Sequence, residues 1–176
     1  INQWWEKNKI TGHGSLIFAY SLGKAQRVLA GLDSSIGPIY AHSAVHSFLE
    51  HYHNAGIVLP EVKKVDKEKD FSGAMIIAPP AVEDSSWTKK FKKTKRGFAS
   101  GWMAIRGPRR RKNIDRGFIL SDHADWPGLI DVITGTGAEM VKLTHGNGDA
   151  LSRFLGEKGI NASVLNESSF RQEERD

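Results

Sequence analysis

The chain has 176 residues, of which 39% are hydrophobic and 26% charged, which is the composition of a globular protein with one sizeable core. It contains no cysteine, and this excludes disulfides, thiolate metal sites and cysteine nucleophiles. The first residues, INQWWEKNKI, do not have the pattern of a signal peptide, and no apolar run is long enough to cross a membrane. We therefore expect a cytoplasmic protein without membrane contact. Because the chain begins with Ile1 and not Met, we expect a fragment or a processed product.

Basic residues are concentrated in one stretch of the chain. Between Trp87 and Lys112 there are eleven Lys and Arg residues and no acidic residue, which leaves 14 basic and 20 acidic residues elsewhere. A surface that interacts only with solvent normally mixes both signs of charge. The segregation therefore favours a polyanionic partner, and nucleic acid is the leading candidate.

Apolar strands alternate with helices along the chain. Strands are expected at residues 15–22, 38–42, 73–82, 96–105, 116–120, 139–144 and 162–166. Helices are expected at residues 1–9, 23–32, 43–56, 85–94, 125–134 and 147–159, with Asp125 as the cap of the fifth. A charged excursion is expected at 62–70. This alternation predicts an α/β fold, a mostly parallel sheet with helices on both faces.

Two histidines directly follow expected strands. His123 lies in LSDHAD and His145 in KLTHGNG, one strand-helix-strand unit apart. Ligands of such sheets bind beyond the carboxyl ends of the strands, and histidine is a common zinc ligand and a common acid or base near neutral pH. The pair therefore indicates an active site. The alternative is structural: one histidine caps a helix and the other bonds within a turn.

The turn SLGKAQR, from Ser21 to Arg27, follows the first expected strand. It lacks the G-x-x-x-x-G-K-[ST] pattern of a P-loop, because Ala25 follows Lys24. Its free amide N–H groups, with Lys24 and Arg27 beside them, still predict an anion site.

Two further patterns do not indicate a catalytic site. His42, His46, His51 and His53 are expected to be exposed on an amphipathic helix and not to bind a metal. The stretch from Ser100 to Trp102 lacks the G-x-S-x-G pattern of a serine hydrolase.

Five segments, in order, resemble the β-CASP branch of the metallo-β-lactamase nucleases. They are SLIFAYSLGKAQRVL, MIIAPPAVEDSSW, FASGWMAIRG, DRGFILSDHADWPGL and VKLTHGNGDAL, and the resemblance spans residues 1 to about 165. It is closest to the bacterial ligase-associated DNA exonucleases, also called mRNA 3′-end processing factor-like. This resemblance implies a β-CASP domain, inserted near the end of a metallo-β-lactamase domain, that covers a two-zinc site. It also implies that a hydroxide bridging the two metal ions hydrolyses phosphodiesters at that site.

The resemblance also implies roles for single residues. His123 matches the motif B histidine, which is thought to protonate the leaving oxygen, and His145 matches the motif C histidine, a ligand of the second zinc. Asp122 and Asp125 would orient His123 or shape its loop. The residues expected to contact nucleic acid are Ser21, Lys24, Arg27, Ser100, Arg106, Arg109, Arg110, Arg111 and Lys112.

The chain departs from the family pattern because the H-x-H-x-D-H run, the later His and Asp ligands and the acidic partner of motif B are missing. These would lie N-terminal to Ile1, and a single histidine does not hold a catalytic zinc tightly. We therefore expect the C-terminal part of a zinc-dependent exonuclease that is inactive alone. Its partners would be the missing N-terminal half, nucleic acid and a DNA ligase. The expected organisation is a β-CASP domain at 1–114, a βαβαβ segment of the metallo-β-lactamase domain at 115–166 and a polar, disordered tail at 167–176.

Two alternatives remain open. One is an RNA 3′-end processing nuclease of the same family, because family members that act on RNA usually carry histidine in motif C. The ligase-associated likeness favours DNA. The other is a non-catalytic nucleic-acid-binding α/β module, in which the basic stretch alone acts and the histidines are structural.

Overall fold

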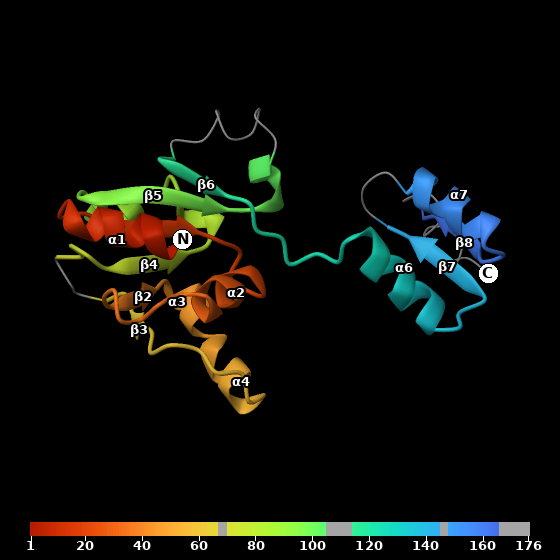
Figure 1. Ribbon diagram of the computed structural model, residues 1–176, viewed down its shortest axis with the longest axis horizontal. Coiled ribbons are helices and arrows are strands. Elements are labelled where there is room, and N and C mark those ends of the chain that lie inside the picture. The colour runs from red at the N-terminus through yellow and green to blue at the C-terminus, as the bar shows by residue number, and fades with distance from the viewer. Residues whose placement is uncertain (67–69, 105–113, 145–147, 166–176) are drawn as a thin grey trace. The chain divides into compact units, whose positions relative to one another are not determined.

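The computed structural model describes residues 1–66, 70–104, 114–144 and 148–165 (Figure 1). The chain forms two compact units, Ile1–Asp122 and His123–Asp176. Every helix in the described part of the chain is too short or too polar to span a bilayer.

The first unit is built on a six-stranded parallel sheet with the order β3-β2-β4-β1-β5-β6. The strands are β1 Gly14–Phe18, β2 Ile39–Ala41, β3 Lys63–Lys64, β4 Met75–Ala78, β5 Thr94–Ala99 and β6 Arg116–Phe118. Leu16 of β1 is in register with Ile76 of β4 on one side and with Arg96 of β5 on the other. All five residues of β1 are buried, as expected for an interior parallel strand. The predicted parallel α/β architecture is confirmed.

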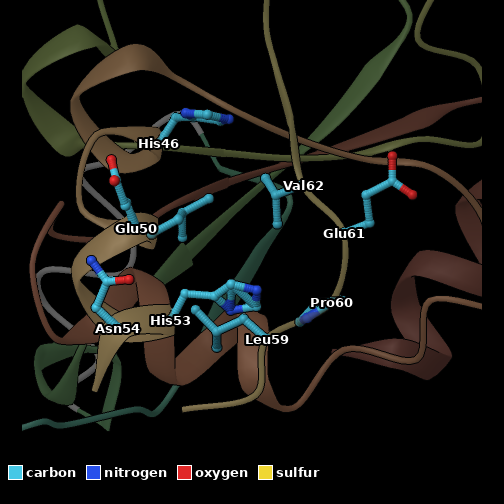
Figure 2. Close-up of a pocket in the computed structure, with 9 residues that line it drawn as sticks. His46, Glu50, His53, Asn54, Leu59, Pro60, Glu61 and Val62 are labelled. Carbon is cyan, nitrogen blue, oxygen red and sulfur yellow. The ribbon is translucent and has the colours of Figure 1, made fainter. Parts of the chain in front are cut away.

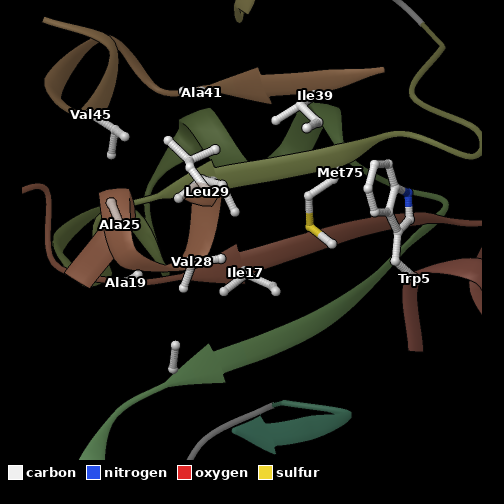
Figure 3. Packing of buried hydrophobic residues seen from close by; sticks show 12 residues of the cluster. Trp5, Ile17, Ala19, Ala25, Val28, Leu29, Ile39, Ala41, Val45 and Met75 are labelled. Carbon is white, nitrogen blue, oxygen red and sulfur yellow. The ribbon is translucent and has the colours of Figure 1, made fainter. Parts of the chain in front are cut away.

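One face of the sheet packs against α-helices. They are α1 Asn2–Ile10, α2 Lys24–Ala30 and α3 Ser43–His46. Trp5, Leu29 and Val45 from these helices meet Ile17 and Met75 of the sheet in one apolar cluster (Figure 3). These strand residues alternate with those that face the other side, as the two-residue period of a strand requires.

The other face packs against short 3₁₀-helices. They are η1 Pro80–Val82, η2 Ser86–Lys90 and η3 Gly101–Ala104. Phe71, Phe91 and Met103 form the second apolar cluster with Leu16 and Phe18 of β1. Helices therefore cover both faces, as predicted, but α-helices cover only the first.

Several element boundaries differ from the predicted ones. The expected basic helix at 85–94 is the short η2, because residues from Thr94 onward pair with β1 and begin β5 early. The strand expected to reach residue 105 ends at Ala99, and η3 follows. The helix expected at 43–56 is divided into α3 and α4 Leu49–Asn54.

The division between the two units also differs from the predicted boundary at residue 114. β6 pairs with β5 through Gly97↔Arg116 and Ala99↔Phe118, and the ring of Phe118 lies 5.4 Å from that of Trp4. Backbone pairing and this aromatic contact hold residues 115–122 in the first unit. β6, the first strand of the expected βαβαβ segment, therefore lies in the first unit.

The second unit contains one parallel strand pair. Its elements are α6 Trp126–Gly135, β7 Met140–Leu143, α7 Asp149–Glu157 and β8 Asn161–Val164. Leu155 is fully buried, and the rings of Trp126 and Phe154 lie 5.2 Å apart. Val132 and Met140 are 64% and 55% exposed, so apolar side chains are accessible on this unit. The expected tail at 167–176 lies outside the described residues.

The start of β1 gives a direct test of the packing. A Cβ at Gly14 would lie 2.4 Å from the backbone oxygen of Phe71, whereas one at Gly31 would meet no heavy atom closer than 3.6 Å. We expect Gly14→Ala to lower the free energy of unfolding by about 1–3 kcal/mol. The control Gly31→Ala should change it by less than about 0.5 kcal/mol. Urea unfolding midpoints measure both, and equal midpoints would contradict the packing at β1.

Candidate functional site

The candidate residues of the first unit gather where β1, β5 and β6 end. The strands are parallel neighbours, so their carboxyl ends lie at the same end of the sheet. Ser100 follows β5, and its amide donates to the carbonyl of Phe118 at 3.0 Å. Ser121 and Asp122 follow β6 and contact the first turn of α2 through Arg27 and Lys24. The carboxyl-end cluster, defined as Ser21, Lys24, Arg27, Ser100 and Asp122, thus comes from three strand ends.

An ion pair between buried Lys24 and partly exposed Asp122 links two segments of this cluster. The ammonium of Lys24 lies 3.0 Å from the carboxylate of Asp122, and their side chains are 3% and 26% exposed. The same ammonium lies 4.6 Å from the centre of the Tyr20 ring. Gly23 has a φ of 79°, and a Cβ there would lie 3.0 Å from Asp122 Oδ2, so both backbone conformation and space require glycine.

The turn between β1 and α2 uses its own polar groups. The amides of Lys24 and Ala25 donate to the carbonyls of Leu22 and Tyr20. Those two amides are thus occupied within the turn, and the Lys24 ammonium is paired with Asp122. The expected anion site therefore lacks these donors in this conformation.

Arg27 is the accessible cation of the carboxyl-end cluster. Its guanidinium donates to the carbonyl of Ser121 at 2.5 Å, and its side chain is exposed. A carbonyl does not neutralise the charge, so Arg27 remains able to attract an anion. The buried side chain of Gln26 donates to the carbonyl of Ser21 at 2.9 Å and fixes the turn.

The second unit begins with two further candidates. Asp125 Oδ1 accepts a hydrogen bond from the amide of Gly128 at 2.9 Å, and Pro127 lies in the first turn of α6. This confirms Asp125 as the predicted helix cap. His123 is exposed, and its catalytic function stays a prediction. The remaining candidates lie outside the described residues: His145, Arg106, Arg109, Arg110, Arg111 and Lys112.

The structure also shows a pocket that the sequence did not indicate. It has a volume of about 530 Å³ and lies between α4 and the extended segment around Pro60 (Figure 2). His46 and His53 line it, together with Glu50 and Glu61. Among the described residues, no three His, Cys, Asp or Glu side chains are grouped closely enough to hold a metal ion.

His42, at the carboxyl end of β2, has a structural function. Its Nδ1 accepts a hydrogen bond from the amide of Ala44 at 3.0 Å and caps α3. Its ring meets that of Trp87 edge to face at 4.8 Å. Partial burial, and secondly the positive charge of Lys90, lower the pKa of His42 below the ordinary value. Both causes favour the neutral ring that the cap needs.

The ion pair predicts an asymmetric response to substitution. Asp122→Ala leaves the Lys24 ammonium buried without its carboxylate, and we expect a loss of about 3 kcal/mol in the free energy of unfolding. The double variant Lys24→Met/Asp122→Ala should be more stable than Asp122→Ala, because the unpaired charge is gone. Denaturant unfolding of the two single variants and the double variant measures this, and additive losses would contradict the pairing.

His42 predicts a loss of stability on acidification. Because the pKa of His42 is lowered in the folded chain, the unfolded chain binds a proton at this histidine at a higher pH than the folded chain does. Stability is therefore complete above about pH 6.5 and falls as the pH decreases through the folded pKa. His42→Asn should keep the cap and weaken this pH dependence. His42→Ala should be about 1 kcal/mol less stable than His42→Asn, because the cap is lost. An unchanged pH dependence in His42→Asn, measured by unfolding between pH 7 and 5, would contradict the assignment.

Comparison with known proteins gives one informative similarity. No known family profile matches the chain. A curated protein named probable DNA ligase, from Opitutus terrae, is 29% identical over 154 residues. The match covers 88% of this chain but only 15% of that protein. The chain is thus similar to a small part of a much longer relative.

Proposed function

We propose that this chain is the C-terminal part of a zinc-dependent exonuclease that hydrolyses phosphodiesters, with DNA favoured over RNA. The carboxyl-end cluster carries this proposal. The sequence indicated its five residues as candidates in segments far apart in the chain, and they meet at one end of the sheet: Ser21, Lys24, Arg27, Ser100 and Asp122. This is the end at which parallel α/β sheets bind their ligands.

His123 is the proposed proton donor to the leaving oxygen. Histidine exchanges protons near neutral pH, and proton transfer to a leaving group is a common source of catalysis. The residue before it, Asp122, is held by Lys24, and two residues later Asp125 caps α6. Asp125 is therefore proposed to shape the segment that leads into α6.

Zinc is proposed to be bound mainly by residues outside this chain. The described residues contain no group suited to a metal ion. His145 would contribute one ligand, and the missing N-terminal metallo-β-lactamase half would supply the others. The chain alone is therefore proposed to be inactive, because a catalytic zinc site normally needs three protein ligands.

The relative supports nucleic acid as the partner. A segment similar to this chain lies within a polypeptide named probable DNA ligase. Exonucleases and DNA ligases both act at the ends of strands, so the two activities have a substrate in common. We therefore propose a DNA ligase as a functional partner. Because the match covers 15% of that protein, the ligase activity itself is not transferred to this chain.

A non-catalytic binding module is the second candidate. Lys89, Lys90, Lys92 and Lys93 are exposed, and none forms an ion pair with another described residue. Such uncompensated charge suits phosphate binding without any chemistry. An H-x-H-x-D-H run upstream of residue 1 in the complete protein would decide for the nuclease. The RNA 3′-end processing alternative uses the same residues and differs in substrate alone.

The nuclease proposal predicts different defects for two histidine variants of the full-length protein. His123→Ala should slow cleavage about 10²–10⁴-fold, because general acid catalysis is lost, and leave the zinc content unchanged. His145→Ala should reduce the bound zinc. Metal analysis and single-turnover rates on both variants measure this.

The leaving group provides the control. A substrate whose leaving oxygen is already a stable anion needs no proton, so it should restore cleavage by His123→Ala but not by His145→Ala. Loss of zinc in His123→Ala, or equal rescue of both variants, would show that the assignment of acid and ligand is wrong.

A further inference from the structure

A cavity of about 340 Å³ lies at the amino end of the sheet, away from the carboxyl-end cluster. It is formed by the segment before β4 and by the segment that leads into β5. Its polar lining includes Asp70, Ser72, Lys90, Lys92 and Lys93, which together we call the lysine pocket. The volume falls in the lower part of the range for ligand sites, roughly 300–1,000 Å³.

The backbone that carries the lysines is fixed. Phe71 and Phe91 form the apolar base of the pocket, are each 5% exposed and have ring centres 4.8 Å apart. The carbonyl of Lys93 accepts a hydrogen bond from the amide of Gly14 at 2.9 Å, which joins the pocket to β1. The hydroxyl of Thr94 donates to the carbonyl of Phe91 at 2.8 Å. The lysines therefore extend from a preformed support.

The positive charge of the lysine pocket is weakly compensated. Lys90, Lys92 and Lys93 are exposed, and no described carboxylate lies within 4.0 Å of their ammonium groups. Asp70 is the one described acidic residue in the lining, and its Oδ1 accepts a hydrogen bond from the amide of Ser72 at 2.9 Å. Like charges that line one cavity repel one another, and an anion in the pocket would relieve that repulsion.

The rest of the described basic stretch is different. Lys95 lies 3.7 Å from the carboxylate of Asp115, which also accepts a hydrogen bond from the amide of Arg96 at 2.7 Å. Lys95 on β5 is thus paired with a carboxylate, whereas the lysines of the pocket are not. Lys90 also lies over the Trp87 ring at 4.9 Å and helps to lower the pKa of His42. Its field therefore extends beyond the pocket.

We propose that the lysine pocket binds a backbone phosphate of a nucleic-acid strand. Lysine acts as a mobile point charge toward phosphate. Lys92 and Lys93 also have backbone amides that donate to no acceptor among the described residues, and such amides are common phosphate contacts. The contact lies at the amino end of the sheet and is separate from the carboxyl-end cluster. This inference rests on the proposed nucleic-acid function.

The test is the salt dependence of oligonucleotide binding by the whole 176-residue chain, followed by fluorescence anisotropy. Lys92→Ala/Lys93→Ala should weaken binding to duplex DNA and reduce the slope of log K against log salt by about 0.9, the value for one lost phosphate contact. The control Lys63→Ala/Lys64→Ala removes the same charge from exposed side chains of β3, outside the pocket. Equal slopes for the two double variants would overturn the proposal.

Substitution of Asp70 tests the pocket by a gain of DNA affinity, and misfolding would not produce such a gain. Asp70→Asn removes the negative charge, yet its side-chain oxygen can still accept the hydrogen bond from the Ser72 amide. We expect tighter DNA binding in Asp70→Asn and an unchanged unfolding midpoint. Unchanged or weaker binding would count against a phosphate in this pocket.

Binding of inorganic phosphate distinguishes a site for a nucleic-acid phosphate from a site for free phosphate. If phosphate binds in a lysine-dependent manner while DNA binding is unaffected by the lysine variants, the pocket is a free-phosphate site and the proposal is wrong. DNA binding that depends on Lys92 and Lys93 in a full-length protein without nuclease activity would leave this inference standing and remove the proposed function.

Discussion

The double pairing of β1 is the constraint on which the rest of the first unit depends. β1 forms backbone hydrogen bonds with β4 along one edge and with β5 along the other, and both of its faces are buried. A parallel strand in this position cannot shift by one residue without turning its two apolar rows toward the wrong cluster. Its carboxyl end therefore places the Tyr20–Lys24 turn beside Asp122, and its amino end places Lys93 beside Gly14. One register thus positions both the carboxyl-end cluster and the lysine pocket.

The Lys24–Asp122 pair adds specificity to this arrangement. Removing an ammonium from water is expensive, and the attraction to a partly exposed carboxylate repays it only with good geometry. An apolar pair would fill the same space, but it would not select one partner among several. We interpret the ion pair as a specific connection between the segment after β1 and the segment after β6. Together with the Arg27–Ser121 bond, it fixes the last residues of the first unit.

The sequence predicted the class of fold because burial and period are local signals. GSLIF and MIIA are apolar at every position, which indicates interior parallel strands, and Asp125 before Trp126-Pro127 indicates a helix start. Boundaries set by tertiary pairing were not predictable in this way. Thr94 and Lys95 have no apolar pattern, yet they begin β5 because they lie opposite Gly14 and Ser15. The placement of β6 in the first unit follows from the same kind of pairing.

The candidate site was predictable in composition but not in its contacts. The position of Lys24 and Asp122 after strands indicated that they would lie at the carboxyl end of the sheet. The sequence did not show that Lys24 would be buried, because a lysine after glycine in a turn is usually exposed. The lysine pocket was also not predictable from the sequence, because its two halves, around Asp70 and Lys92, are distant in the chain. The hydrogen bond from Gly14 to Lys93 and the edge-to-face contact of Phe71 with Phe91 bring them together.

The charges at the two ends of the sheet have different physical consequences. At the carboxyl end the Lys24 charge is cancelled by Asp122, which leaves Arg27 as the accessible cation of the cluster. At the amino end Lys90, Lys92 and Lys93 face a single carboxylate, that of Asp70, within the described lining. Long-range attraction of a polyanion depends on net charge, whereas chemistry depends on titratable groups held in place. Under the proposed function, the lysine pocket would supply the attraction, and the carboxyl-end cluster would supply the fixed geometry that a reaction needs.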